Sequence, residues 1–179
     1  MADRNILIAE FLSSAGWINA SRTPLVGDAS FRQYERITFE KERAIFMDAP
    51  PEKEDVRPFL FITEHLRSLG YSAPKIYAAD PDAGFILMED LGNTTFTLML
   101  ATGADETELY KCAVDLLIDL HSRPARDAVP ARLPLYDNQK LLEEVILFTD
   151  WYIPQFLNSQ TADVARDKYV SIWQCLLRL

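Results

Sequence analysis

The stretch Arg43-Ala44-Ile45-Phe46-Met47-Asp48-Ala49-Pro50-Pro51 begins with a predicted strand over residues 43–47. The two prolines cannot donate to a sheet ladder, so they end this strand. The strand before it covers residues 31–39 and is joined to it by Glu40-Lys41-Glu42, which is short enough for a hairpin. An earlier strand over residues 22–26 is joined by the turn-forming cluster Gly27-Asp28-Ala29-Ser30. The sequence therefore predicts three consecutive antiparallel strands.

A helix and two more strands follow the prolines. Apolar residues recur at helical spacing over residues 59–69, and Gly70 stops the helix. Residues 75–79 and 84–89 are predicted strands on either side of the turn Asp80-Pro81-Asp82-Ala83. A further helix precedes the first strand. This order predicts an α+β fold, a five-stranded antiparallel sheet with a helix against it.

The chain becomes helical after Gly92. Periodic apolar residues predict helices over residues 109–121, 141–152 and 164–179. We therefore expect two domains, residues 1–92 with the sheet and residues 93–179 with the helices. The last apolar pattern carries no Gly, Asn or Pro stop signal, so we expect the second domain to be truncated.

The composition argues against some partners. The 179 residues include 27 acidic and 18 basic side chains, a formal net charge of -9. Such a chain repels nucleic acid and anionic membranes, so we expect neither as a partner. The sequence has no apolar run of the ~20 residues that a membrane span needs, and its start lacks the apolar core of a signal peptide. Cys112 and Cys175 have no metal-binding spacing, so we expect buried free thiols in a cytoplasmic protein.

Three groups of residues resemble one enzyme superfamily. They are residues 27–34 with 43–51, the run Phe85-Ile86-Leu87-Met88-Glu89-Asp90-Leu91-Gly92, and Leu133-Pro134-Leu135-Tyr136-Asp137 followed by Phe148-Thr149-Asp150-Trp151-Tyr152. Together they are similar to the kinase-like aminoglycoside phosphotransferase superfamily, closest to the bacterial anomeric kinases of N-acetylmuramate and N-acetylglucosamine in peptidoglycan recycling. The resemblance implies a protein-kinase-like small lobe, followed by the first helices of a large lobe. It also implies ATP and Mg²⁺ as cofactors and a small-molecule hydroxyl as the acceptor.

The resemblance places the phosphates of ATP against a loop of mostly small residues, Gly27, Asp28, Ala29, Ser30 and Phe31. Small side chains let backbone N–H groups approach phosphates closely, and Ser30 adds a hydroxyl. A plain hairpin turn is the alternative for this segment. Arg32 follows the loop and either offers a fork of donors to a phosphate or is an exposed strand residue.

The resemblance places the adenine at a hinge over residues 88–91. An extended segment between two lobes leaves backbone N–H and C=O groups outside the sheet, and Glu89 and Leu91 are the expected contacts. Apolar area for the ring is expected from Ile45, Leu87 and Met88. The alternative is a strand end followed by a turn.

Met47 stands where kinases carry the strand lysine that holds the α- and β-phosphates. Methionine cannot donate to a phosphate, but the amino-sugar kinases share the Met-Asp-Ala-Pro form, so the resemblance holds. In kinases a helix glutamate pairs with that lysine. Glu64 is the corresponding residue here, or a solvated helix position. Arg32 and Arg43 are the remaining candidates for the phosphate partner.

Three aromatic residues are candidates for binding the acceptor. Phe148, Trp151 and Tyr152 have helical spacing, and aromatic faces stack on sugar rings. Packing in a helical core is the alternative role.

No candidate catalytic residue or metal ligand is found in the chain. Phosphoryl transfer in this superfamily needs an aspartate in an HxDxxxxN-like loop and a later aspartate for Mg²⁺. Neither His65 nor His121 begins such a loop, so the resemblance implies that these groups follow Leu179 and that the chain alone is inactive. We also expect exposed apolar helix faces and self-association. The alternatives are a non-catalytic nucleotide-binding or docking module, and a kinase for choline, homoserine or an aminoglycoside.

Overall fold

The computed structural model describes residues 3–26 and 30–177, and its central element is an antiparallel sheet in the order β1-β2-β3-β5-β4. The strands are β1 (Ser21–Pro24), β2 (Gln33–Phe39), β3 (Glu42–Asp48), β4 (Ile76–Asp80) and β5 (Phe85–Glu89). All five predicted strands are confirmed, with ends that shift by one or two residues. The α+β class predicted from the sequence is therefore correct.

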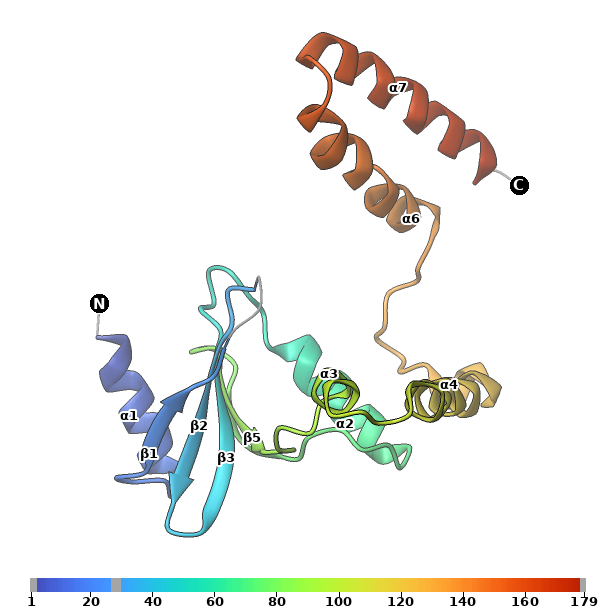
Figure 1. Ribbon diagram of the computed structural model, residues 1–179. Helices are drawn as coiled ribbons and strands as arrows, with labels where there is room; N and C mark the ends of the chain where they lie inside the picture. Colours follow the sequence, from blue (N-terminus) through green and yellow to red (C-terminus); the bar gives the residue numbers. More distant parts are fainter. Residues whose placement is uncertain (1–2, 27–29, 178–179) are drawn as a thin grey trace. The chain divides into compact units, whose positions relative to one another are not determined.

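Two helices cover the two faces of the sheet, α1 (Arg4–Ser14) and α2 (Arg57–Ser68) (Figure 1). On the face that α1 covers, Ile8 and Leu12 pack with side chains of alternate strand positions, among them Ile37, Ala44, Phe46, Phe85 and Leu87. On the other face, the intervening strand residues Met47, Ile86 and Met88 pack with Val56 and with Phe59 and Leu60 of α2. We call these the α1 face and the α2 face. The strict alternation of strand side chains therefore divides the core into two layers.

Arg4 joins the start of α1 to the end of β3. Its Nε and Nη2 donate to Asp48 Oδ1 at 2.9 and 2.5 Å, and Nη2 also donates to the carbonyl of Ala83 at 2.9 Å. The guanidinium carbon lies 4.7 Å from the ring centre of Phe85. One side chain thus fixes the angle at which α1 lies on the sheet.

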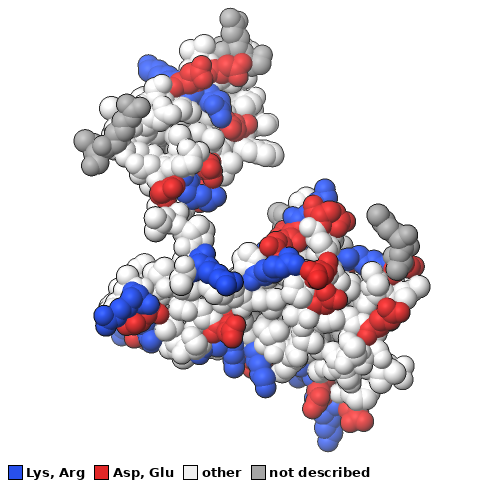
Figure 2. Space-filling view, turned by 180° about the vertical axis from the view of Figure 1, so that it is seen from behind, with Lys and Arg blue, Asp and Glu red and all other residues white. Residues whose placement is uncertain are grey.

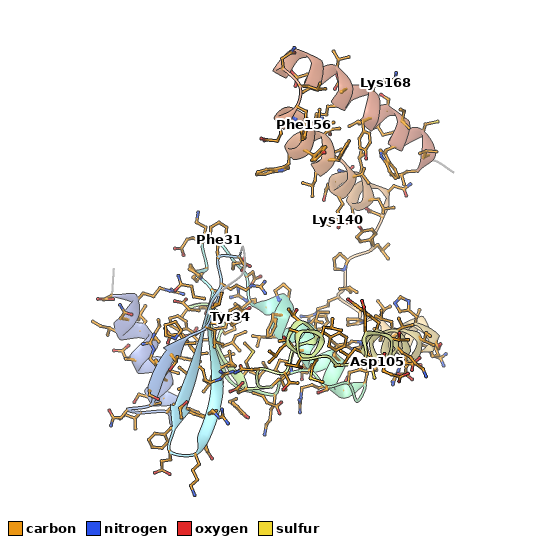
Figure 3. All side chains as sticks on the ribbon, in the orientation of Figure 1. Phe31, Tyr34, Asp105, Lys140, Phe156 and Lys168 are labelled. Atoms are coloured by element: carbon orange, nitrogen blue, oxygen red, sulfur yellow. The ribbon has the colours of Figure 1, made fainter. Side chains whose placement is uncertain are left out.

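Three more helices complete the first part of the chain: α3 (Phe96–Ala101), α4 (Glu106–Ser122) and α5 (Ala125–Ala128). Asp105, labelled in Figure 3, caps α4 by accepting from the N–H of Glu108 at 3.0 Å. Two contacts connect α2 and the residues after it to these helices. His65 Nε2 lies 2.8 Å from the carbonyl of Ala128, and the hydroxyl of Tyr71 donates to Asp119.

The chain divides into two compact units, residues 1–130 and 131–179. The second unit contains α6 (Asn138–Val145), the π-helical turn η1 (Phe148–Tyr152), the 3₁₀ turn η2 (Ile153–Gln155) and α7 (Ser159–Leu176). The predicted continuous helix over residues 141–152 is therefore wrong in its second half. The predicted domain boundary at residues 92 and 93 lies inside the first compact unit, and it stays a prediction.

The structure also bears on the predictions made from composition about membranes, charge and cysteines. In the described part of the chain, no helix is long and apolar enough to cross a membrane. Acidic and basic side chains are interspersed on the face that Figure 2 shows. The predicted burial of Cys112 and Cys175 is wrong, because both thiols lie on exposed sides of α4 and α7.

Candidate functional site

The strand register places three of the predicted nucleotide-binding side chains, those of Ile45, Met47 and Met88, in adjacent rows on the α2 face. Met47 lies opposite Tyr34 on β2 and opposite Ile86 on β5. In the next row, Ile45 lies opposite Arg36 on β2 and Met88 on β5. Ile45, Met47 and Met88, which are far apart in sequence, are thus neighbours. Leu87 points to the α1 face and is fully buried there, so the structure does not bring it together with Ile45 and Met88, and its predicted contact with the ring stays a prediction.

Met47 is part of the core. Its side chain has no exposed surface and packs with Val56, Ile86 and Met88. Because Met47 has no exposed surface, a ligand could contact it only if the side chains that cover it moved. Met47 therefore supports the residues of the face by packing beneath them. A direct contact between Met47 and a nucleotide stays a prediction.

Ser30 and Phe31 are the described part of the predicted phosphate loop, and Arg32 follows them; Gly27, Asp28 and Ala29 lie outside the described residues. The N–H of Arg32 donates to Ser30 Oγ at 3.0 Å, which makes a tight turn before β2. Phe31, labelled in Figure 3, is 61% exposed, and Lys53 Nζ lies 5.3 Å from its ring centre. An exposed aromatic ring with a cation over it marks this end of the sheet.

Arg32 is held by a carboxylate that the sequence did not single out. Its Nε and Nη2 donate to Glu54 Oε2 at 3.3 and 3.2 Å. Burial lowers the pKa of Arg32, but hydrogen bonds with Tyr34 and Glu54 outweigh it and raise this pKa above its ordinary value. The residue therefore keeps its charge, and its position beside Tyr34 places it at the loop end of the α2 face.

Glu64 does not pair with Arg32. It is an exposed residue of α2 and forms no ion pair among the described residues. It lines a hollow of about 340 Å³ between α2 and β4, together with Leu60, Thr63, Arg67, Lys75 and Ile76. The glutamate that meets a candidate phosphate-binding cation is Glu54, ten positions earlier, in the connection that follows β3.

The predicted hinge begins where β5 ends. The N–H of Glu89 donates to the carbonyl of Lys75 at 2.8 Å, and the N–H of Lys75 donates to Glu89 Oε2 at 2.9 Å. These bonds hold Glu89 against the residue that precedes β4. Within residues 3–26 and 30–177, the N–H of Leu91 has no hydrogen-bond acceptor, and the Leu91 side chain is 60% exposed. An open backbone donor thus lies at one of the two positions expected to contact the base.

Arg36 holds the residues on both sides of Leu91, and the sequence did not single it out. Its Nε and Nη2 donate to the two carboxylate oxygens of Asp90 at 2.7 and 3.1 Å, and Nη2 also donates to Asn93 Oδ1 at 2.8 Å. The N–H of Gly92 donates to Asp90 Oδ1 at 2.9 Å. The only sequence signal for this arrangement was an aspartate two residues before a glycine, which favours a local turn.

The electrostatics of this pair are consistent with two permanent charges. The hydrogen bonds from Arg36 lower the pKa of Asp90 despite the opposing effect of burial, and the N–H of Gly92 lowers it further. The same hydrogen bond raises the pKa of Arg36. Only 6% of the Asp90 side chain and 18% of the Arg36 side chain are exposed.

The second unit gathers most of the predicted acceptor-binding aromatic residues into one cluster. The rings of Phe148 and Tyr152 stack at 5.3 Å, and Tyr152 lies 4.8 Å from Phe156, which Figure 3 labels. Tyr169 of α7 also contacts Phe148 at 5.7 Å. Trp151 is 73% exposed. The cluster packs against itself and still leaves Phe148 and Tyr152 about half exposed, so both roles considered for it stay open.

A metal centre is not formed by the described residues, in which no three potential His, Cys, Asp or Glu ligands lie together. The described residues of the predicted site are an apolar row of Ile45 and Met88, an open backbone donor three residues after Met88, and cations at the loop end.

Comparison with known proteins gives one consistent group. A family model described as "Phosphotransferase enzyme family" matches residues 21–179. A protein of Pseudomonas aeruginosa named N-acetylmuramate/N-acetylglucosamine kinase is 34% identical over 174 residues, which cover 96% of this chain and 50% of that protein. Proteins of the same name from Caulobacter vibrioides and Neisseria meningitidis are 31% and 34% identical, and the matches cover 96% and 82% of this chain and 56% and 42% of those proteins. The chain spans about half the length of the curated relatives it matches.

Proposed function

Because the chain belongs to the phosphotransferase enzyme family, we propose that the protein transfers the γ-phosphate of ATP to the anomeric hydroxyl of an amino sugar, N-acetylmuramate or N-acetylglucosamine. The names of its relatives support this acceptor class. The nucleotide part is supported by the pairing of Ile45 with Met88 across β3 and β5 and by the open N–H of Leu91, three residues after Met88. Adenine needs one apolar face and an edge with a donor and an acceptor, and this arrangement offers both.

In this proposal the first unit binds the nucleotide. Ile45 and Met88 cover the face of the base, the carbonyl of Glu89 accepts from its amino group, and the N–H of Leu91 donates to a ring nitrogen. The phosphates extend towards residues 27–31, where backbone N–H groups and Arg32 neutralise their charge. Arg32 takes over the task of the strand lysine that Met47 replaces, and Glu54 orients it as a helix glutamate orients that lysine.

The groups that transfer the phosphate are proposed to lie outside these 179 residues. The sequence has no HxDxxxxN-like loop, and no metal ligand is assigned to the described residues. Mg²⁺ would neutralise charge between the β- and γ-phosphates when it is bound. The part of this chain is to bind and orient ATP.

A transfer assay tests the acceptor. The product of the complete reading frame that contains this sequence is incubated with ATP, Mg²⁺ and either amino sugar, and the reducing end of the sugar is titrated. Phosphorylation of the anomeric hydroxyl consumes one reducing end for each ADP formed. The methyl glycoside of N-acetylglucosamine, whose anomeric oxygen is blocked, is the matched control and should remain inert. Transfer to choline, homoserine or an aminoglycoside, with both sugars inert, would replace this acceptor class by another.

A non-catalytic role is the second candidate for the chain itself. The lack of an HxDxxxxN-like loop in its sequence favours a nucleotide-binding or docking module. In that case the 179-residue chain binds ATP in a direct titration, and no product of the reading frame consumes sugar reducing ends.

A further inference from the structure

Arg36 connects β2 to the segment that follows β5. The contacts run from the guanidinium to both oxygens of Asp90 and to Asn93 Oδ1, with donor–acceptor distances of 2.7, 3.1 and 2.8 Å. β3 lies between β2 and β5 in the sheet, so the side chain must pass over β3 to reach Asp90. A contact 54 positions apart in sequence therefore determines where the chain goes after the sheet.

The Arg36 side chain starts and ends at the two parts of the proposed base site, the apolar row and the open backbone N–H. Arg36 starts in the row of Ile45 and Met88, which would cover the base. It ends on Asp90 and Asn93, on either side of Leu91, whose N–H is open within the described residues. Gly92 adopts a φ of +83°, and its N–H closes a turn on Asp90. The direction of the Leu91 N–H is thus fixed from both sides.

The geometry points to Arg36 as a positioning residue: held in a fork by Asp90 and bonded to Asn93, it fixes residues 90–93 so that the open backbone donor of Leu91 meets the edge of a purine nucleotide. This assignment rests on the proposed function, because the ligand is the ATP of that proposal. The planar guanidinium suits the task, since two parallel bonds to one carboxylate fix direction as well as distance. Lysine would keep the charge and lose the fork.

The same sheet provides a matched control. On the α1 face, Arg22 of β1 forms a similar fork with Glu35 of β2, at 2.5 Å through Nε and 3.0 Å through Nη2. Its side chain is 30% exposed and that of Glu35 is 23% exposed. Arg22→Lys therefore loses the same kind of contact on the face away from the proposed base site, whereas Arg36→Lys loses it beside that site.

Hydrogen exchange tests whether the connection fixes the segment. In the 179-residue chain with Arg36→Lys, the amide of Gly92, which donates to Asp90 Oδ1, should exchange at least about tenfold faster than in the unaltered chain, because a bidentate charged pair that holds Asp90 has become a single contact. Amides of β3 and β5 should keep their rates, which shows that the sheet is intact. Arg22→Lys should leave the exchange rate of the Gly92 amide unchanged. Unchanged exchange at Gly92 in Arg36→Lys overturns the assignment.

Titration with ATP tests the positioning role. The dissociation constant should rise about tenfold in Arg36→Lys and change by less than about twofold in Arg22→Lys. The double variant Arg36→Gln/Asp90→Asn leaves no unpaired buried charge and should weaken ATP binding in the same way. If exchange rises but ATP affinity stays within twofold, Arg36 does not position the base and the inference fails. If the unaltered chain binds no ATP, the proposed nucleotide site fails, and with it the positioning role; the exchange result still decides whether Arg36 fixes the segment.

Discussion

Met47 occupies the position at which the resemblance to kinases would place a phosphate-binding lysine. Its side chain is fully buried on the α2 face, so the position that carries a phosphate-binding lysine in kinases serves the core here. In the proposed nucleotide site the cation is therefore Arg32, which pairs with Glu54 at the loop end of that face. The substitution was visible in the sequence, but the compensating partner Glu54 was not.

Among the described glycines, Gly84 is the one at which an added methyl group should lower the stability of the fold most. Its φ is +74°, and an added Cβ would lie 1.8 Å from the carbonyl oxygen of Ala49, which the backbone holds in place. Gly84→Ala should therefore lower the free energy of unfolding by about 3 kcal/mol, since left-handed strain and a backbone clash add. Urea unfolding followed by circular dichroism is the readout.

Gly70→Ala is the matched control for Gly84→Ala. Gly70 has a φ of +89°, and no atom lies within 4 Å of its added Cβ. Only the backbone strain remains, so the loss should be about 1 kcal/mol. Equal losses for the two variants would mean that the contact with Ala49 does not constrain the turn.

Asp90 should make stability depend on pH. Its pKa is lowered in the folded state, chiefly by Arg36, so the charged form stabilises the fold. This contribution is complete above the unfolded pKa of about 3.9 and is lost as the pH falls through the lower folded pKa. Asp90→Asn should cost about 2 kcal/mol at pH 7, and the difference from the unaltered chain should shrink below about pH 4.

The measurement is urea unfolding of both chains between pH 7 and pH 2.5. Asp115→Asn, at an exposed position of α4, is the control and should differ little from the unaltered chain at every pH. A deficit in Asp90→Asn that stays constant down to the lowest pH would contradict a folded pKa below the unfolded one.

At the scale of elements, the hairpin between β2 and β3 is tighter than the sequence suggested. Phe39 pairs with Glu42, so the loop contains only Glu40 and Lys41, one residue fewer than predicted. Glu40 has a φ of +54°, a backbone angle that residues other than glycine rarely adopt. A positive φ at the first of two loop residues is typical of the turn that favours glycine there.

Glu40→Gly should therefore stabilise the protein, by about 0.5 to 1 kcal/mol, because the strain at this position is removed. Lys41→Gly, at the neighbouring loop position, should instead be slightly destabilising through the added flexibility of the unfolded chain. Thermal unfolding of the two variants side by side measures both. A lower midpoint for Glu40→Gly would show that the side chain of Glu40 stabilises the turn by more than its backbone costs.

The strands were predictable for a physical reason, and η1 was not. Strand side chains alternate with a period of two, and prolines or turn residues end each strand, so local sequence carries the signal. In contrast, the apolar spacing of residues 141–152 predicted one helix, and the structure has a π-helical turn at Phe148–Tyr152. There Thr149 Oγ1 donates to the carbonyl of Ile146 at 2.9 Å, a local bond that competes with the regular helix pattern.

At the scale of the whole molecule, α4 exposes an apolar stripe. Tyr110, Val114, Leu117 and Ile118 follow one another at helical spacing, and each side chain is 51 to 56% exposed. Apolar stripes of this kind on a protein surface favour association. We therefore predict that the chain self-associates through α4, although its net charge of -9 opposes close approach.

Sedimentation velocity over a hundredfold range of concentration tests this prediction. Val114→Glu/Leu117→Glu should weaken association at least tenfold, because two apolar side chains lose burial and two charges are added. Lys41→Glu changes the net charge by the same two units at an exposed hairpin residue outside α4, and should have a smaller effect. Equal effects of the two changes would assign the loss to overall charge and leave the stripe without a role.

The sequence by itself determined the order of the five strands and the α+β class, because these depend on local periodicity and turn residues. The position of the candidate hinge came from the resemblance to a known family and stays a prediction. The motifs also pointed to the family that the comparison found. Only the tertiary structure decided which side chains meet across the sheet: Arg32 with Glu54, and Arg36 with Asp90 and Asn93. Such contacts depend on strand register and on the order β1-β2-β3-β5-β4, which bring residues 22 and 54 positions apart within hydrogen-bond distance. No local pattern encodes that distance, since a shift of one residue in register would turn these side chains to the other face.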